Sequence, residues 1–163
     1  MTIIGHDAQV DAFLSAMRGD RPHHGWIFAG PKGVGKATLA RQLAARILAE
    51  AADPALPRTS EFLAPDHKTH SLMNARSHPD FRLVEREVWQ KPPNQNKLVP
   101  YDLRKDNEPP ARSIKVIQIR WLGELLSKVP SLSNRRVVMI DAAEDMEAAS
   151  ANALLYLFEV PPT

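Results

Sequence analysis

Residues 30–36 read Gly30-Pro31-Lys32-Gly33-Val34-Gly35-Lys36 and match the pattern G-x-x-x-x-G-K. The apolar run Trp26–Ala29 lies directly before them and predicts a buried strand. After the glycine-rich stretch, apolar residues recur at helical spacing from Leu39 to Leu48, which predicts a helix. A strand, a glycine-rich turn and a helix in this order are the context that a phosphate-binding loop requires.

The residue types of the loop explain its expected chemistry. Glycines let the backbone curl so that successive N–H groups point inward at phosphate oxygens. The helix that follows adds the positive end of its dipole. Lys36 is placed to set a point charge against the β- and γ-phosphates of a nucleotide. We therefore predict a nucleotide site on Gly30 to Thr38, with ATP as the candidate ligand.

The position after the loop lysine argues against hydrolysis of ATP. It normally carries Ser or Thr, because that hydroxyl ligates Mg²⁺. This chain has Ala37 there, which offers no oxygen. Thr38 is one residue further on and is rotated by about 100° around the helix. Nucleotide binding therefore remains the expectation, whereas metal-dependent hydrolysis is not expected.

A second acidic motif leads to the same conclusion. The apolar run Val137–Ile140 is typical of a parallel strand buried on both faces, and Asp141 ends it. Such an Asp holds Mg²⁺ from the end of a strand that neighbours the loop. ATP-hydrolysing proteins usually place Glu next, to orient the attacking water, but this chain has Ala142. Glu144 and Asp145 are expected to charge the start of the last helix.

The remaining pattern indicates an α/β layered fold. Three further helices are predicted by apolar residues at helical spacing: Val10, Phe13, Leu14 and Met17; Ile119, Leu122, Leu125 and Leu126; and Ala151, Leu154, Leu155 and Phe158. Nine of the fourteen prolines lie in residues 53–113, which predicts a long irregular insert. Within it, the turn His78-Pro79-Asp80 is expected to lead into a strand over Phe81–Val84.

Composition excludes several classes of protein. The chain has 163 residues and no cysteine, so disulfides, thiolate nucleophiles and Cys-ligated zinc are excluded. No apolar run approaches the roughly 18 residues that span a bilayer, and the N-terminus does not read as a signal peptide. We expect a soluble, cytoplasmic protein without membrane contact. A formal net charge of +2 is low for a dedicated nucleic-acid binder.

Several short motifs resemble the delta-prime family of bacterial DNA polymerase III clamp-loader subunits, which are AAA+ proteins. They occur in the family's order: Ile3-Ile4-Gly5-His6, His23-His24-Gly25-Trp26, residues 30–36, His78-Pro79-Asp80, Ser150–Leu155 and Glu159–Pro162. The Asn-Ala-Leu-Leu stretch followed by Glu-x-Pro-Pro is the most specific of them. The loop with Gly-Lys-Ala-Thr and the cysteine-free insert is similar to alphaproteobacterial members.

The resemblance implies a P-loop NTPase fold of the AAA+ RecA-like type, with three layers and a parallel sheet. Residues 1–163 would be the N-terminal part of the nucleotide-binding domain, truncated at the C-terminus, with the lid, the collar and the arginine finger outside this chain. The family's structural zinc is not expected, because its four cysteines are missing.

The implied function is that of a non-hydrolysing stator. Such a subunit works in the clamp loader of the DNA polymerase III holoenzyme, a nucleotidyltransferase complex, beside the gamma/tau and delta subunits. The complex loads the sliding clamp onto primed DNA during replication. One alternative is an active, gamma/tau-like AAA+ ATPase that uses Lys36, Thr38 and Asp141. A small-molecule P-loop kinase is another, but no acceptor-substrate site is recognisable in the sequence.

Overall fold

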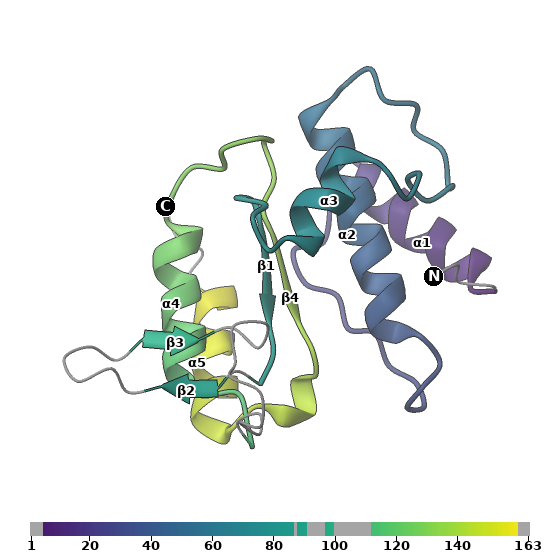
Figure 1. The fold of residues 1–163 in the computed structure, drawn as a ribbon. Coiled ribbons are helices and arrows are strands. Elements are labelled where there is room, and N and C mark those ends of the chain that lie inside the picture. The colour runs from purple at the N-terminus through teal and green to yellow at the C-terminus, as the bar shows by residue number, and fades with distance from the viewer. Residues whose placement is uncertain (1–4, 87, 91–96, 100–111, 160–163) are drawn as a thin grey trace. The chain divides into compact units, whose positions relative to one another are not determined.

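Residues 5–86, 88–90, 97–99 and 112–159 are described in the computed structural model of the chain. The elements follow one another as α1 (Asp7–Arg18), α2 (Lys36–Ala52), α3 (Lys68–Asn74), β1 (Phe81–Val84), β2 (Val88–Gln90), β3 (Lys97–Val99), α4 (Val116–Leu126), β4 (Val137–Ile140), η2 (Ala143–Asp145) and α5 (Ala148–Glu159) (Figure 1). The chain divides into unit 1, Met1–Arg82 with Pro130–Met139, and unit 2, Leu83–Val129 with Ile140–Thr163. None of the described helices has both the length and the apolar character needed to cross a membrane.

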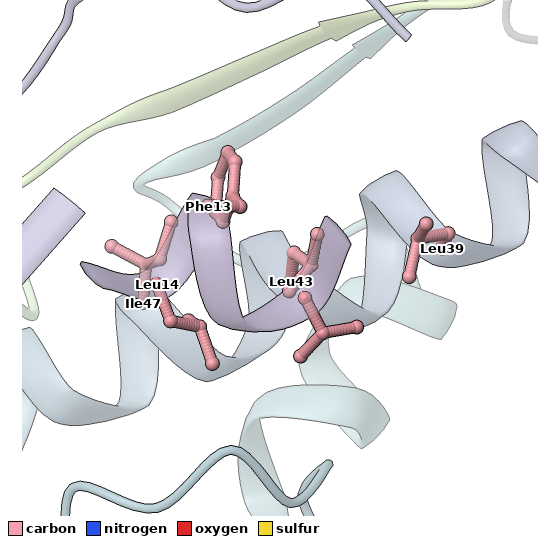
Figure 2. Packing of buried hydrophobic residues seen from close by; sticks show 6 residues of the cluster. Phe13, Leu14, Leu39, Leu43 and Ile47 are labelled. Atoms are coloured by element: carbon pink, nitrogen blue, oxygen red, sulfur yellow. The ribbon is translucent and has the colours of Figure 1, made fainter. Parts of the chain in front are cut away.

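The core of unit 1 is built where α1 packs on α2. The predicted apolar stripes of both helices are confirmed, and Figure 2 shows the side chains that meet: Phe13, Leu14, Leu39, Leu43 and Ile47. Burying one such side chain contributes about 1.5–3 kcal/mol. The opposite face of α2 packs its small residues and Leu48 against Leu63 and Met73. Because α2 is covered on two sides, it forms a rigid support behind the loop at its N-terminus.

A parallel pair of strands, β1 and β4, carries the second acidic motif. The Val137 N–H donates to the Asp80 carbonyl at 2.9 Å, and the Asp141 N–H donates to the Val84 carbonyl at 2.9 Å. Both partners advance by four residues in the same direction, which is the parallel arrangement. Both strands were predicted. The prediction that β4 is buried on both faces is wrong, because all four of its residues are only half-buried.

The predicted strand over Trp26–Ala29 is wrong. These residues form no strand, and Ile27 is 93% exposed. In the described part of the chain the sheets are β1–β4 and β2–β3, and neither includes this run. The rings of Trp26 and Phe28 instead pack on Phe13 of α1, with centroids 4.7 and 5.9 Å away. A short apolar run shows that a surface is buried but not which element covers it, and here a helix covers two of its rings.

In unit 2, α4 and α5 pack against each other. The buried Ser150 hydroxyl donates to the Ile114 carbonyl at 2.7 Å, and the Ile114 N–H donates to the Asp145 carbonyl at 2.7 Å. These bonds fix the start of α5 to the segment before α4. Both helices were predicted, but Glu144 and Asp145 lie in η2 rather than at the start of α5, so that expectation is wrong.

The range predicted as an irregular insert contains regular structure. Helix α3 and strand β1 lie within it, and β2 and β3 form an antiparallel pair in which Val88 faces Val99. Residues 91–96 and 100–111 of this range lie outside the described residues. Helices beside a parallel strand pair agree with the predicted α/β class. The three-layer P-loop arrangement stays a prediction.

Candidate functional site

The glycine-rich loop contains two glycines in the left-handed region of backbone conformation. Gly33 and Gly35 have φ angles of +91° and +90°, in the left-handed region that favours glycine. A Cβ atom at either position would meet nothing within 4 Å, so conformation rather than space requires glycine here. Gly35 caps α2, whose backbone begins at Lys36 with the Leu39 N–H donating to the Gly35 carbonyl at 2.8 Å. The first turn of α2 therefore follows the loop directly, and its leading N–H groups lack partners within the helix.

Lys36 places its positive charge against the backbone of the loop. Its ammonium group donates to the carbonyls of Gly30 at 2.7 Å and Pro31 at 2.9 Å. The side chain therefore reaches back to the first two residues of the loop. To bind a phosphate oxygen, the Lys36 ammonium would donate to that oxygen in place of these carbonyl oxygens. Lys32 is exposed and makes no hydrogen bond or ion pair within the described residues.

Helix α2 positions the two residues that follow the lysine. Ala37 and Thr38 are half-buried in its first turn. The methyl group of Ala37 supplies no ligand for a metal ion, as the sequence indicated. The Thr38 hydroxyl belongs to the next helical position, about 100° further around the axis.

One neighbour of the loop was not singled out as a site residue. The ring Nε2 of His6 lies 3.4 Å from the Val34 carbonyl, across 28 residues of sequence. His6 has a φ of +72°, uncommon for a residue other than glycine, and it caps α1 while its carbonyl accepts from the Val10 N–H at 2.9 Å. No local sequence pattern signals this contact, because the fold and not the spacing brings His6 to the loop.

Asp141 lies at the carboxyl end of β4, as predicted, and is exposed. Ala142 follows it and leads into η2. Asp141 belongs to unit 2, whereas the loop belongs to unit 1. Coordination of one Mg²⁺ ion by Asp141 together with a nucleotide on the loop therefore stays a prediction. In the described ranges no group of three or more His, Cys, Asp or Glu residues is arranged to hold a metal ion.

The strand pair that presents Asp141 depends on a buried carboxylate, Asp80. Its oxygens accept from the backbone N–H groups of Ser131 at 2.6 Å, Leu132 at 2.7 Å and Ser133 at 2.9 Å. Burial favours the neutral carboxyl, but these bonds outweigh it and lower the pKa of Asp80. The carboxylate thus ties the start of β1 to the loop that enters β4. Sequence analysis identified a turn at this point but not the bonds to residues some fifty positions away.

His78 completes this turn. Its ring Nδ1 accepts from the Asp80 N–H at 3.2 Å. Burial lowers the pKa of His78, although the Asp80 carboxylate raises it. The ring is therefore neutral near pH 7, and its role is to shape the turn, as the sequence predicted.

The family model described as DNA polymerase III, delta subunit, matches residues 5–163. The chain belongs to this family. It is 30% identical over 151 residues to DNA polymerase III subunit delta' of Pseudomonas aeruginosa. The matched region covers 92% of this chain and 38% of that protein.

Two further relatives are also named as DNA polymerase III subunits. Subunit delta' of Bacillus subtilis is 28% identical over 144 residues, with 87% of this chain and 34% of the relative covered. Subunit gamma of Buchnera aphidicola is 26% identical over 160 residues, with 98% and 36% covered. The chain thus spans little more than a third of the length of the relatives it matches. The resemblance to delta-prime clamp-loader subunits is confirmed, and the alphaproteobacterial type stays a prediction.

Proposed function

We propose that the whole protein is a clamp-loader subunit that binds ATP on the loop Gly30–Lys36 without hydrolysing it. In this proposal it acts as a stator beside the gamma/tau and delta subunits and helps to load the sliding clamp onto primed DNA. Membership of the DNA polymerase III delta subunit family supports a role in this complex. Two relatives are named as delta' subunits, which supports the delta-prime role in particular.

The observation that carries the proposal is a glycine-rich loop directly before a helix, combined with two missing catalytic groups. The left-handed glycines at 33 and 35 and the start of α2 support phosphate binding, although residues 26–29 form no strand before them. Ala37 and Ala142 stand where hydrolysis needs a hydroxyl and a carboxylate. Binding depends on the loop backbone and Lys36, whereas hydrolysis also depends on those two side chains. A protein with this combination holds nucleotide as a fixed part of an assembly.

Release of phosphate from ATP by the whole protein with Mg²⁺ tests the proposal. We expect the same background rate for the unchanged protein and for Lys36→Ala. Lys32→Ala serves as the matched control, because Lys32 lies in the same loop but is exposed. Steady turnover that Lys36→Ala abolishes and Lys32→Ala preserves would contradict a non-hydrolysing subunit.

The alternative of an active ATPase is tested by the same assay. It requires the Thr38 hydroxyl and Asp141 to share a Mg²⁺ ion. The similarity to a gamma subunit supports this alternative. In that case Thr38→Val and Asp141→Asn each abolish turnover. If both variants match the unchanged protein, the alternative is wrong.

A further inference from the structure

A cavity in unit 1 is lined mainly by charged and polar groups. It has a volume of about 190 Å³ and lies between α1, the C-terminal end of α2, residues 54–58 and the segment before β4. Glu50 contributes to its wall, fourteen residues after Lys36 on the same helix. At 1.5 Å per residue the cavity is therefore about 20 Å along α2 from the loop, so the two sites are separate.

Three arginines and one glutamate line this cavity: Arg18, Arg58, Arg135 and Glu50. The glutamate is already saturated by cations. Arg18 donates to it from Nη2 at 2.6 Å and from Nε at 3.2 Å, and Arg46 donates from Nε at 2.7 Å. Although burial opposes the charge, these two guanidinium groups lower the pKa of Glu50. The carboxylate is thus ionised and fully paired.

The other two lining arginines have no carboxylate partner in the described part of the chain. Arg135 donates from Nη1 to the Met17 carbonyl at 3.1 Å, which leaves its charge uncompensated. Arg58 is exposed, and no hydrogen bond or ion pair holds its side chain within the described ranges. Asn134 adds an amide to the same wall. The cavity therefore presents unused donors and unpaired positive charge.

The ends of two helices oppose this charge but do not cancel it. The lining residues carry a formal charge of +2, from three arginines and one glutamate. The C-terminal ends of α1 and α2 each contribute about half a negative charge. About one positive charge remains on the lining residues.

We propose that this cavity binds a phosphate group. Guanidinium groups match phosphate geometry with two parallel N–H donors, which is the recognition that Arg58 and Arg135 can supply. The cavity is smaller than the roughly 300–1,000 Å³ of pockets for drug-sized ligands. It therefore takes an isolated phosphate group rather than a whole nucleotide. That group is either free inorganic phosphate or one phosphate of a DNA backbone.

Titration of the chain with inorganic phosphate at constant ionic strength, followed by amide NMR, tests the proposal. Lys36→Ala provides the background, because it removes the charge through which the loop would hold phosphate. In that background we expect saturable shifts of the backbone amides at positions 55, 56, 58, 134 and 135. Arg58→Ala and Arg135→Ala should each weaken phosphate binding about tenfold, which corresponds to about 1.4 kcal/mol. Arg21→Ala is the matched control, since Arg21 is exposed and does not line the cavity.

A second arm separates the two sources of phosphate. A short single-stranded oligonucleotide is titrated in the same way. If the oligonucleotide shifts the same residues and Arg58→Ala weakens its binding, the ligand is a DNA phosphate. If only inorganic phosphate shifts these residues, the ligand is the free ion. Both results support the site. Arg58 is exposed, so its loss leaves the fold intact and keeps the test decisive. The proposal is wrong if Arg58→Ala binds phosphate as tightly as the background protein, or if Arg21→Ala weakens binding equally.

Discussion

Substitution of Asp80 by asparagine isolates the contribution of one buried carboxylate to the strand pair that presents Asp141. One carboxylate oxygen accepts from Ser131, and the other accepts from Leu132 and Ser133. Asparagine keeps the shape but replaces one oxygen with an NH₂ group. In the more favourable orientation, the asparagine oxygen accepts from Leu132 and Ser133, and the NH₂ group points toward the Ser131 N–H. Two donors then face each other in a site where Asp80 has no exposure to water.

The size of the effect follows from these contacts. A hydrogen bond to a charged group contributes about 1.5–3 kcal/mol, and a neutral one about 0.5–1.5 kcal/mol. Asp80→Asn loses one charged bond and converts two others to neutral bonds, so we expect a loss of about 4 kcal/mol in the free energy of unfolding. Asp20→Asn is the matched control: Asp20 is exposed, and a change there stays within about 0.5 kcal/mol.

Urea unfolding followed by circular dichroism measures both variants, at pH 7 and at several lower values. The bonds lower the pKa of Asp80 in the folded chain, so its stabilisation is complete above the unfolded pKa of about 3.9. It is lost as the pH falls from there through the folded pKa. The difference between the unchanged chain and Asp80→Asn should therefore shrink below about pH 4. A difference under about 1 kcal/mol at pH 7, or one that does not shrink in acid, refutes this reasoning.

Three other changes follow from the same structure. Glu50→Ala leaves two guanidinium groups without their shared carboxylate and should cost about 3 kcal/mol by urea unfolding. Gly33→Ala forces a side chain into a left-handed backbone and should destabilise the chain by about 1–2 kcal/mol, whereas Gly19→Ala, at φ −69°, should not. Ile27→Thr should leave the melting temperature unchanged, because Ile27 is 93% exposed, whereas Leu43→Ala should cost about 2–5 kcal/mol. A marked loss of stability in Ile27→Thr would instead support the predicted buried strand over Trp26–Ala29.

Helices were predicted well because their signal is contained in the helix itself. The stripe of Val10, Phe13 and Leu14 needs only one apolar partner, and α2 provides it. The run Trp26–Ala29 was misread because strands are defined by a neighbour that the local sequence does not contain. Residues 137–140 were correctly predicted as a strand, yet their degree of burial depends on what covers them and was overestimated.

The candidate site shows the same division. Glycine at 33 and 35 suits the left-handed backbone found there, because glycine adopts that conformation without strain. The contact of His6 with Val34 and the bonds from Ser131 and its neighbours to Asp80 cross 28 and 51 residues of sequence. No single-sequence pattern encodes such pairs. Motifs therefore identified candidate phosphate-binding groups and turn residues, but not the long-range contacts that those residues make.

Calorimetric titration of the chain with ATP, with and without Mg²⁺, tests the central claim most directly. We expect ATP to bind, Lys36→Ala to weaken binding at least tenfold, or about 1.4 kcal/mol, and Lys32→Ala to leave it unchanged. Because Ala37 offers no hydroxyl to a metal ion, Mg²⁺ should change the affinity little. No heat of binding, or binding that Lys36→Ala leaves intact, would contradict the claim that this loop is a working phosphate site.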